Sequence, residues 1–230
     1  FTVYGTQLAL PFSDHPFGLG SVFIIDPLYT LPLLIGAGWA LATRGDGRGL
    51  RANVIGLVLS TAYLGWGVVA QQRVERVAQA SLAFQGIVAE RILITPTPFN
   101  SLLWRIVAMS GDRYHEGFYS LLDKDPQIAF DAFARGHDLA VELQANPGAQ
   151  RVAAFSKGFF KLQQDGTRVL ITDLRMGQEP DYIFSFAVAE RQSPPQALPR
   201  PEQVGTRPDV RRLLQWLWRR MLGEPMVLPR

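Results

Sequence analysis

Two long stretches with almost no charge constrain the fold of this chain more than any other feature. Between Pro16 and Thr43 the only residue with a formal charge is Asp26, and residues 52–72 contain none. Each stretch is long enough to cross the hydrocarbon core of a bilayer, which is about 30 Å thick, as a helix. We therefore predict a membrane protein with two spans, Phe23–Ala42 and Ala52–Ala70, that form an antiparallel hairpin.

Asp26 is the polar residue of greatest interest in these spans. Burying an ionised carboxylate in hydrocarbon is costly, so we expect it to face other protein groups, a metal, water or a proton. Pro27 and Pro32 follow it and are expected to kink or interrupt the first span. The alternative for Pro27 is the first helical turn, where its missing N–H costs nothing and where Asp26 caps the helix.

The regions around the two spans have distinct compositions. Residues 1–20 are rich in glycine, proline and aromatic residues, which predicts an interfacial loop. Residues 21–72 hold the two spans, joined by the arginine-rich loop Thr43–Arg51, which favours the cytoplasm and places the following domain outside it. Residues 73–86 predict an amphipathic helix that continues the second span. Because the chain begins at Phe1 and lacks signal-peptide features, we interpret it as a fragment.

Residues 87–192 predict a soluble α+β domain with a mainly antiparallel sheet. The expected strands, from their period of two, are Arg91–Thr95, Leu103–Met109, Tyr114–Leu122, Gly158–Leu162, Arg168–Leu174 and Tyr182–Ala189. Helical patterning is expected around Ala129–Phe133, His137–Gln144 and Ala149–Phe155. Charges on these strands, namely Arg105, Asp112, Glu116, Asp173 and Arg175, are interpreted as cross-strand pairs on a wet sheet face, with Asp173 and Arg175 pointing to one side as an ion pair.

The C-terminal region predicts a proline-rich linker over residues 193–207 and an amphipathic helix over residues 208–223. The apolar stripe of this helix comprises Val210, Leu213, Leu214, Leu217 and Met221, with Trp216 and Trp218 at its borders and four arginines largely off it. This pattern is typical of a helix that lies on anionic lipid. It also fits a helix whose stripe docks on the soluble domain.

The composition limits the chemistry that the chain can perform. It contains no cysteine, and its three histidines, His15, His115 and His137, lack the paired spacing of zinc sites. Phosphate-loop, dinucleotide and serine-hydrolase motifs are missing from the sequence. The basic residues are 20 arginines and 3 lysines, a bias that suits phosphate or carboxylate contacts and also follows from GC-rich coding. We expect membrane lipid as a partner and no nucleic acid.

Four segments together resemble a known bacterial family: Phe1–Leu8 (FTVYGTQL), Ser21–Pro32 (SVFIIDPLYTLP), Thr95–Arg105 (TPTPFNSLLWR) and Asp173–Gly177 (DLRMG). The family is the inner-membrane predicted metal-dependent hydrolases, the LexA-regulated, YdjM-like group, and the resemblance covers nearly the whole chain. It implies a multi-pass protein of the bacterial inner membrane.

The resemblance also implies a divalent metal, most readily zinc, held mainly by His and Asp residues on helices upstream of Phe1. Asp26 would then be a ligand or general base, with Thr6 and Gln7 as substrate-binding residues, and the substrate would be a lipid or phosphoester. Two other functions stay open: a non-enzymatic membrane protein whose soluble domain binds a partner or envelope component, and a proton-coupled carrier that uses Asp26. The metal, the substrate and the oligomeric state do not follow from the sequence.

Overall fold

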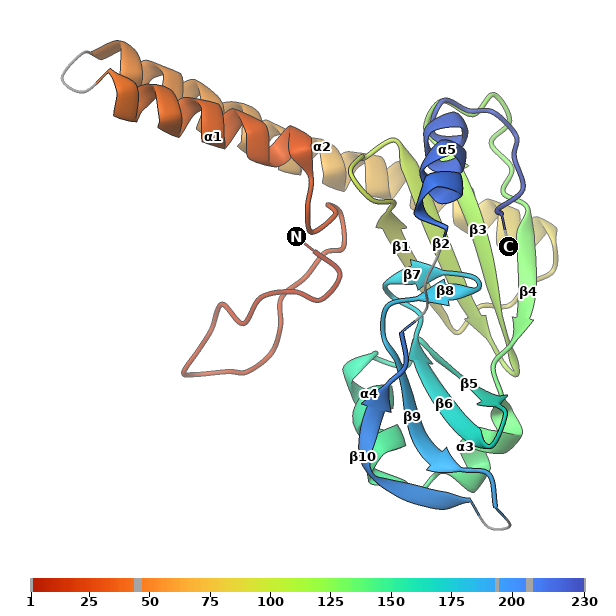
Figure 1. Cartoon of the computed structure of the whole chain (residues 1–230). Helices are drawn as coiled ribbons and strands as arrows, with labels where there is room; N and C mark the ends of the chain where they lie inside the picture. Colours follow the sequence, from red (N-terminus) through yellow and green to blue (C-terminus); the bar gives the residue numbers. More distant parts are fainter. Residues whose placement is uncertain (1, 44–46, 193–194, 206–208, 230) are drawn as a thin grey trace.

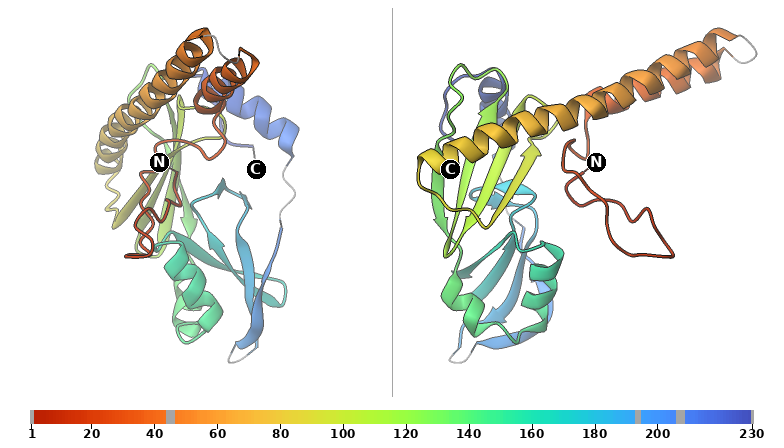
Figure 2. Two further views of the ribbon diagram at one scale, coloured as in Figure 1. Left: turned by 90° about the vertical axis from the view of Figure 1, so that its left-hand side faces the viewer. Right: turned by 180° about the vertical axis from the view of Figure 1, so that it is seen from behind.

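A pair of antiparallel helices projects from a domain of two antiparallel sheets (Figure 1). The computed structural model describes residues 2–43, 47–192, 195–205 and 209–229. Helix α1 (Pro27–Ala42) packs along the first half of α2 (Gly47–Phe84). Helix α2 has 38 residues, so it is about 57 Å long at 1.5 Å per residue. Its second half continues beneath the first sheet, as Figure 2 shows from behind.

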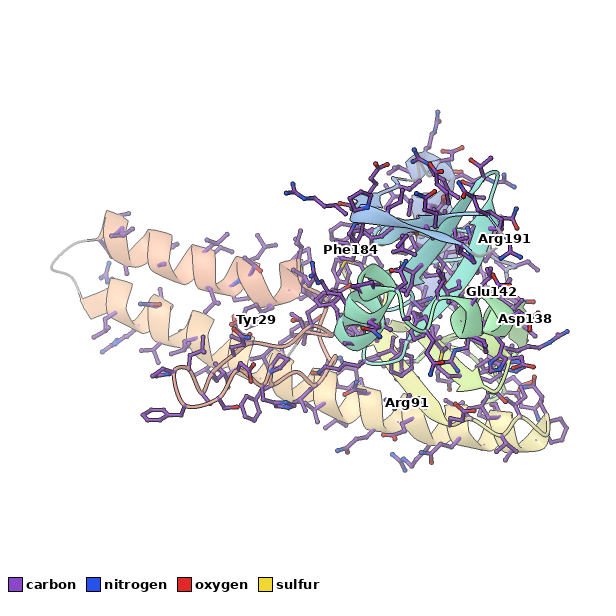
Figure 3. All side chains as sticks on the ribbon, turned by 90° about the horizontal axis from the view of Figure 1, so that it is seen from below. Tyr29, Arg91, Asp138, Glu142, Phe184 and Arg191 are labelled. Carbon is purple, nitrogen blue, oxygen red and sulfur yellow. The ribbon has the colours of Figure 1, made fainter. Side chains whose placement is uncertain are left out.

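The packing of the helix pair is the reverse of that in a water-soluble helical hairpin. Small residues are buried between the helices, including Gly36 of α1 and Gly49, Gly56 and Ser60 of α2, whereas the large apolar side chains point outward and are mostly more than half exposed. Figure 3 shows these side chains standing free of the domain beyond Tyr29. Close backbone contact through small residues, with apolar residues facing outward, is typical of helices solvated by lipid.

One of these helices is long and apolar enough to cross a membrane by length and composition, namely α2. Helix α1 begins at Pro27 rather than Phe23, and its 16 residues span about 24 Å. The interruption expected at Pro32 is wrong, because α1 continues through it, and the kink expected as its alternative stays a prediction. Pro32 has no N–H for the carbonyl oxygen of Leu28, and the neighbouring carbonyl oxygen of Tyr29 accepts from the Ser60 hydroxyl of α2 at 2.8 Å. The loop predicted over Thr43–Arg51 is wrong for residues 47–51, which belong to α2, and residues 44–46 lie outside the described part of the chain.

The first sheet is a meander in the order β1-β2-β3-β4. Its strands are β1 (Arg91–Pro96), β2 (Leu103–Ser110), β3 (Arg113–Ser120) and β4 (Phe130–Ala134). The second half of α2 covers one face through Ala70, Val74 and Ala78, which pack on a cluster that includes Trp104 and Ile106. The expected helix at Ala129–Phe133 is wrong: this segment is mostly edge strand β4, whose register pairs Phe133 with Tyr114.

The second sheet has the order β10-β9-β6-β5. Its strands are β5 (Phe160–Asp165), β6 (Arg168–Asp173), β9 (Ser185–Glu190) and β10 (Gln196–Gln203), and helices α3 (His137–Glu142) and α4 (Pro147–Phe155) cover one face. The linker predicted over residues 193–207 is wrong for Gln196–Gln203, which pair with β9 as an edge strand. Pro199 and Pro201 fit there because the ladder has an irregularity between Ala197 and Glu202, and edge strands tolerate proline at such places.

The two sheets meet at a small hairpin, β7 (Gly177–Gln178) and β8 (Asp181–Tyr182). Tyr182 and Leu174 pack there against Val107, Met109 and Tyr114 of the first sheet, and all five side chains are buried. The architecture therefore confirms the predicted fold class: a helix pair followed by an α+β domain with antiparallel sheets.

Helix α5 (Val210–Met221) docks on the first sheet, on the face opposite α2. Trp216 and Met221 are buried against Leu103, and Leu213 and Leu217 pack beside them. Trp216, which the sequence places at the border of the stripe, is the most buried residue of the helix at 3% exposure. The stripe is therefore divided, because Val210 and Leu214 remain 58% and 48% exposed.

Candidate functional site

Asp26 is held at the start of α1 by hydrogen bonds to both helices. It is 2% exposed. Its Oδ1 accepts from the backbone N–H of Leu28 at 3.0 Å, and its Oδ2 accepts from the hydroxyl of Tyr63 in α2 at 2.8 Å. Asp26 is thus the N-cap of α1, a position that aspartate favours because it satisfies an otherwise unpaired N–H. Pro27 occupies the first turn of α1, which confirms the alternative prediction that it begins the helix and does not interrupt it.

The β1–β2 loop contacts α2 one turn from Tyr63. The indole nitrogen of Trp66 donates to the hydroxyl of Ser101 at 3.1 Å. Asn100 fixes the shape of this loop, since its side-chain oxygen accepts from the backbone N–H groups of Leu102 and Leu103. The helix pair and the first sheet therefore meet at a polar junction that includes Asp26, Tyr63 and Ser101.

Thr6 and Gln7 make their contacts elsewhere. The backbone of Thr6 pairs with Phe17, and the side chain of Gln7 donates to the carbonyl oxygen of Asp14 at 3.0 Å. Both residues are exposed. These contacts stay within the N-terminal loop, whereas the partners of Asp26 come from α1 and α2, so the structure does not bring the three predicted site residues together in one hydrogen-bonded cluster.

A cavity lies where the N-terminal segment, the first sheet and the β7–β8 hairpin meet, and we call it the junction cavity. It measures about 200 Å³. Its apolar lining comprises Val3, Val22, Phe23, Ile24, Pro96, Pro98, Met176, Ile183 and Leu213, and its polar lining includes Thr95, Thr97, Arg105, Arg175, Gln178 and Asp181. Phe23 and Ile24 come just before α1 begins, so the cavity is at the level where the chain enters the helix pair.

Arg105, at one end of the junction cavity, belongs to a buried ionic cluster. Its Nε lies 2.6 Å from Oε1 of Glu116, and its Nη1 and Nη2 donate to the carbonyl of Leu174 and the hydroxyl of Tyr182 at 2.7 and 3.1 Å. Burial lowers the pKa of Arg105, but the adjacent carboxylate raises it, and the pKa is raised overall. The predicted wet sheet face is wrong here, since Arg105 and Glu116 are 4% and 2% exposed.

A second buried pair extends this cluster. Lys161 Nζ lies 2.5 Å from Oε1 of Glu179, and the same oxygen accepts from the Tyr114 hydroxyl. The backbone N–H of Glu179 donates to Oε2 of Glu116 at 3.2 Å. Burial raises the pKa values of Tyr114 and Tyr182, which keeps both phenols protonated at neutral pH. The cluster joins the two sheets through satisfied, paired charges.

Arg175 lines the other part of the cavity and lies against two aromatic rings, Tyr4 and Phe155, which stack on each other with ring centres 5.5 Å apart. Its guanidinium carbon lies 4.5 Å from the ring centre of Tyr4 and 4.7 Å from that of Phe155. Its Nη2 lies 2.7 Å from Oδ2 of Asp173, which confirms the predicted ion pair. Burial and the Asp173 carboxylate raise the pKa of Tyr4. Through Tyr4 the N-terminal segment thus reaches the second sheet.

A metal site does not form from the residues present. Within the described part of the chain, no three His, Asp or Glu side chains come close enough to hold an ion. The histidines are dispersed: His15 packs edge-on to Phe17, His115 is on β3, and His137 lies 3.6 Å from Asp112. Asp26 already uses both carboxylate oxygens.

The junction cavity has no signature in the sequence. Its walls come from segments as far apart as Val3 and Leu213, so no local pattern could mark it. One signal was present at Asp173–Gly177, where an ion pair precedes a glycine turn. The left-handed φ of Gly177, 119°, and the 2.5 Å that would separate an added Cβ from the Asp181 carbonyl oxygen both require glycine there.

The fold and these contacts define a class of protein: a domain of two antiparallel sheets from which a helix pair projects, with a cavity at the base of the pair and one helix long and apolar enough to cross a membrane. Residues 1–74 match the model of the YdjM inner membrane protein family. This match ends at Val74, where α2 reaches the core of the first sheet, so the family resemblance is supported for the N-terminal third and not for nearly the whole chain. No curated protein and no solved structure gives a significant match to this chain.

Proposed function

We propose that this chain is a membrane-anchored module that binds the apolar part of a lipid-like molecule in the junction cavity. The observation that carries the proposal is the position of a mostly apolar cavity beside Phe23 and Ile24, directly before α1. Largely apolar cavities with a few polar groups are the usual ligand sites of proteins. Apolar cavities of about 150 Å³ bind a benzene-sized molecule, so this volume suits a segment of an acyl chain.

The two arginines of the cavity support an apolar ligand, because each is already paired with a carboxylate. Arg105 is paired with Glu116, and Arg175 with Asp173. A neutral hydrocarbon segment would not leave a charge unpaired on entering, whereas a second anion would compete with carboxylates that are already in place.

The test is binding of a fluorescent long-chain fatty acid to the full chain purified in detergent, together with mass spectrometry of lipids that co-purify. Ile183→Trp should fill the cavity and weaken binding about tenfold, because Ile183 lines it and is half exposed, so a larger ring is accommodated without unfolding. Val141→Trp is the matched control, an exposed aliphatic residue on α3. Equal binding by both variants would refute the proposal.

The topology that goes with this function is a multi-pass hairpin in the bacterial inner membrane with the domain on the extracytoplasmic side. Support comes from the apolar outer surface of the helix pair and from the arginines around its connecting loop. Reporter fusions at Gly47 and Gln163 should then fall on opposite sides of the membrane. If both reporters lie on the same side, the prediction that α2 crosses the membrane is wrong.

Metal-dependent hydrolysis is the second candidate, and it rests on the YdjM family match over residues 1–74 and on the buried carboxylate of Asp26. The described residues do not form a metal site, and the resemblance places the main ligands, for zinc or a similar ion, outside this sequence. Asp26 would then give up its hydrogen bonds to the Leu28 N–H and the Tyr63 hydroxyl and act as a metal ligand or general base.

Asp26→Asn in the full-length protein separates these candidates. Asparagine also caps helices, so insertion and folding should persist. The hydrolase proposal expects metal-dependent activity to be abolished in this variant and retained in Tyr63→Phe, which removes a hydrogen bond to the same carboxylate but keeps its charge. Normal activity and metal content in Asp26→Asn would exclude Asp26 from catalysis.

A further inference from the structure

Helix α5 presents a second apolar face that the domain does not cover. Val210, Leu214 and Trp218 recur every four residues and therefore form one stripe along the helix. Their exposures are 58%, 48% and 61%, and Leu222 extends the stripe at 49%. The docked stripe, with Trp216 and Met221, lies on an adjacent face.

Basic residues accompany this exposed stripe. Arg211 and Arg212 are exposed, and among the described residues neither has an ion-pair partner. Arg219 is also exposed, although it pairs with Glu224, whereas Arg220 turns inward to Asp123. An exposed apolar stripe that includes a tryptophan and is flanked by arginines is typical of helices in the interface of an anionic bilayer.

The first turns of α5 lie near the base of the helix pair. Leu213 shares the junction cavity with Phe23 and Ile24, which directly precede α1. The neighbours Leu102 and Leu103, against which α5 packs, follow Ser101, and Ser101 accepts from Trp66 of α2. In the view from the free end of the helix pair, α5 lies across the direction of the pair (Figure 2, left).

We propose that the Val210–Leu214–Trp218 face of α5 rests in the headgroup region of the membrane in which the helix pair is anchored, with Arg211 and Arg212 toward anionic lipid. The bilayer is the occupant because the patch combines apolar side chains with two exposed arginines that form no ion pair with any described residue, and because α5 shares the junction cavity with the residues that directly precede α1. This second attachment fixes the angle between the domain and the membrane. It is independent of any ligand in the junction cavity.

The absence of cysteine from the chain permits a direct test. A single cysteine at Trp218 or at Leu214, labelled with an environment-sensitive fluorophore, reports depth in proteoliposomes of the full chain. The control label is at Gln164, an exposed residue near the β5–β6 turn of the second sheet. In vesicles with phosphatidylglycerol, labels on α5 should be quenched by spin-labelled lipid and protected from acrylamide, and the Gln164 label should show the opposite.

The contribution of charge is tested in the same vesicles. Arg211→Gln with Arg212→Gln, or replacement of phosphatidylglycerol by phosphatidylcholine, should lower lipid quenching at residue 218 about twofold. Arg151→Gln, an exposed arginine of α4, is the matched control and should change nothing. Acrylamide quenching on α5 equal to that at Gln164 would overturn the proposal, and so would lipid quenching that is unaffected by both charge and lipid type.

Discussion

Replacing Gly56 by alanine should separate the two packed helices α1 and α2. A Cβ added at Gly56 would lie 2.3 Å from the carbonyl oxygen of Pro32 and 3.1 Å from its carbonyl carbon. Both are backbone atoms of α1, so neither can move aside by a rotamer change. The same substitution at Gly65, nine residues further along α2, meets nothing within 4 Å. The two variants therefore make the same chemical change with and without a clash.

The expected magnitudes follow from two opposing effects. Alanine is preferred to glycine in a helix interior by about 1 kcal/mol, and both variants gain this. Overpacking at Gly56 costs about 1–3 kcal/mol, because the helices must move apart or bend. Gly65→Ala should consequently be neutral or stabilising, and Gly56→Ala should be less stable than Gly65→Ala by about 1–3 kcal/mol.

The measurement is reversible unfolding of the reconstituted chain by titration with sodium dodecyl sulfate in bicelles. Fluorescence of Trp39 and Trp66 reports on the helix pair, since one belongs to α1 and the other to α2. Equal unfolding free energies for the two alanine variants would show that Gly56 does not mediate close contact, and the packing argument for the pair would fail.

Three further predictions concern the domain. Glu116→Gln should lower the free energy of unfolding by about 3 kcal/mol, measured by denaturant titration in detergent, because it leaves the charge of Arg105 buried without a carboxylate. Burial raises the pKa values of Tyr114 and Tyr182 above their ordinary value of 10, so stability should be constant below about pH 10 and fall above it, as the unfolded state alone ionises. Phenolate absorbance for these two residues should accordingly appear together with unfolding and not before it. Trp216→Ala should cost about 3–5 kcal/mol and expose the C-terminal segment to protease, because its buried ring anchors α5.

Much of the fold could be predicted from the sequence because it depends on local periodicity. The uncharged stretches identified the helix pair, and alternation identified β1–β3, β5 and β6, since burial of one sheet face imposes a period of two. The pairing of Asp173 with Arg175 followed from the same period. These features require no knowledge of which segments meet in space.

The errors arose where tertiary contacts outweigh local preference. The alanine-containing segment Phe130–Ala134 favours a helix on its own, but pairing with β3 makes it a strand. Gln196–Gln203 has the proline content of a linker, yet an edge position with an irregular register accepts it. The apolar stripe of α5 was visible in the sequence, but the side of the helix that meets the domain was not. That side is set by the contact of Trp216 with Leu103, which are more than 100 positions apart in the sequence.

The candidate site was the least predictable part. Asp26 was marked by its charge and, as a possible helix cap, by the Pro27 that follows it, but its partner Tyr63 became apparent only from the packing of α1 on α2. Arg175 was interpreted as one half of an ion pair, whereas it also lies against the stacked rings of Tyr4 and Phe155, which are more than 150 positions apart in the sequence. Residues this far apart in the sequence have no fixed spacing that a sequence motif could describe.

Because α2 is one continuous helix, a change in the membrane around its first half would move the domain packed on its second half. The helix whose first half we propose to lie in lipid packs on the core of the first sheet in its second half, through Ala70, Val74 and Ala78. A membrane thinner than the apolar length of the pair is accommodated by tilt. Since α2 is helical throughout this region, tilt of the helix would turn the first sheet with it. The thickness of the membrane would then set the angle between the first sheet and the membrane plane.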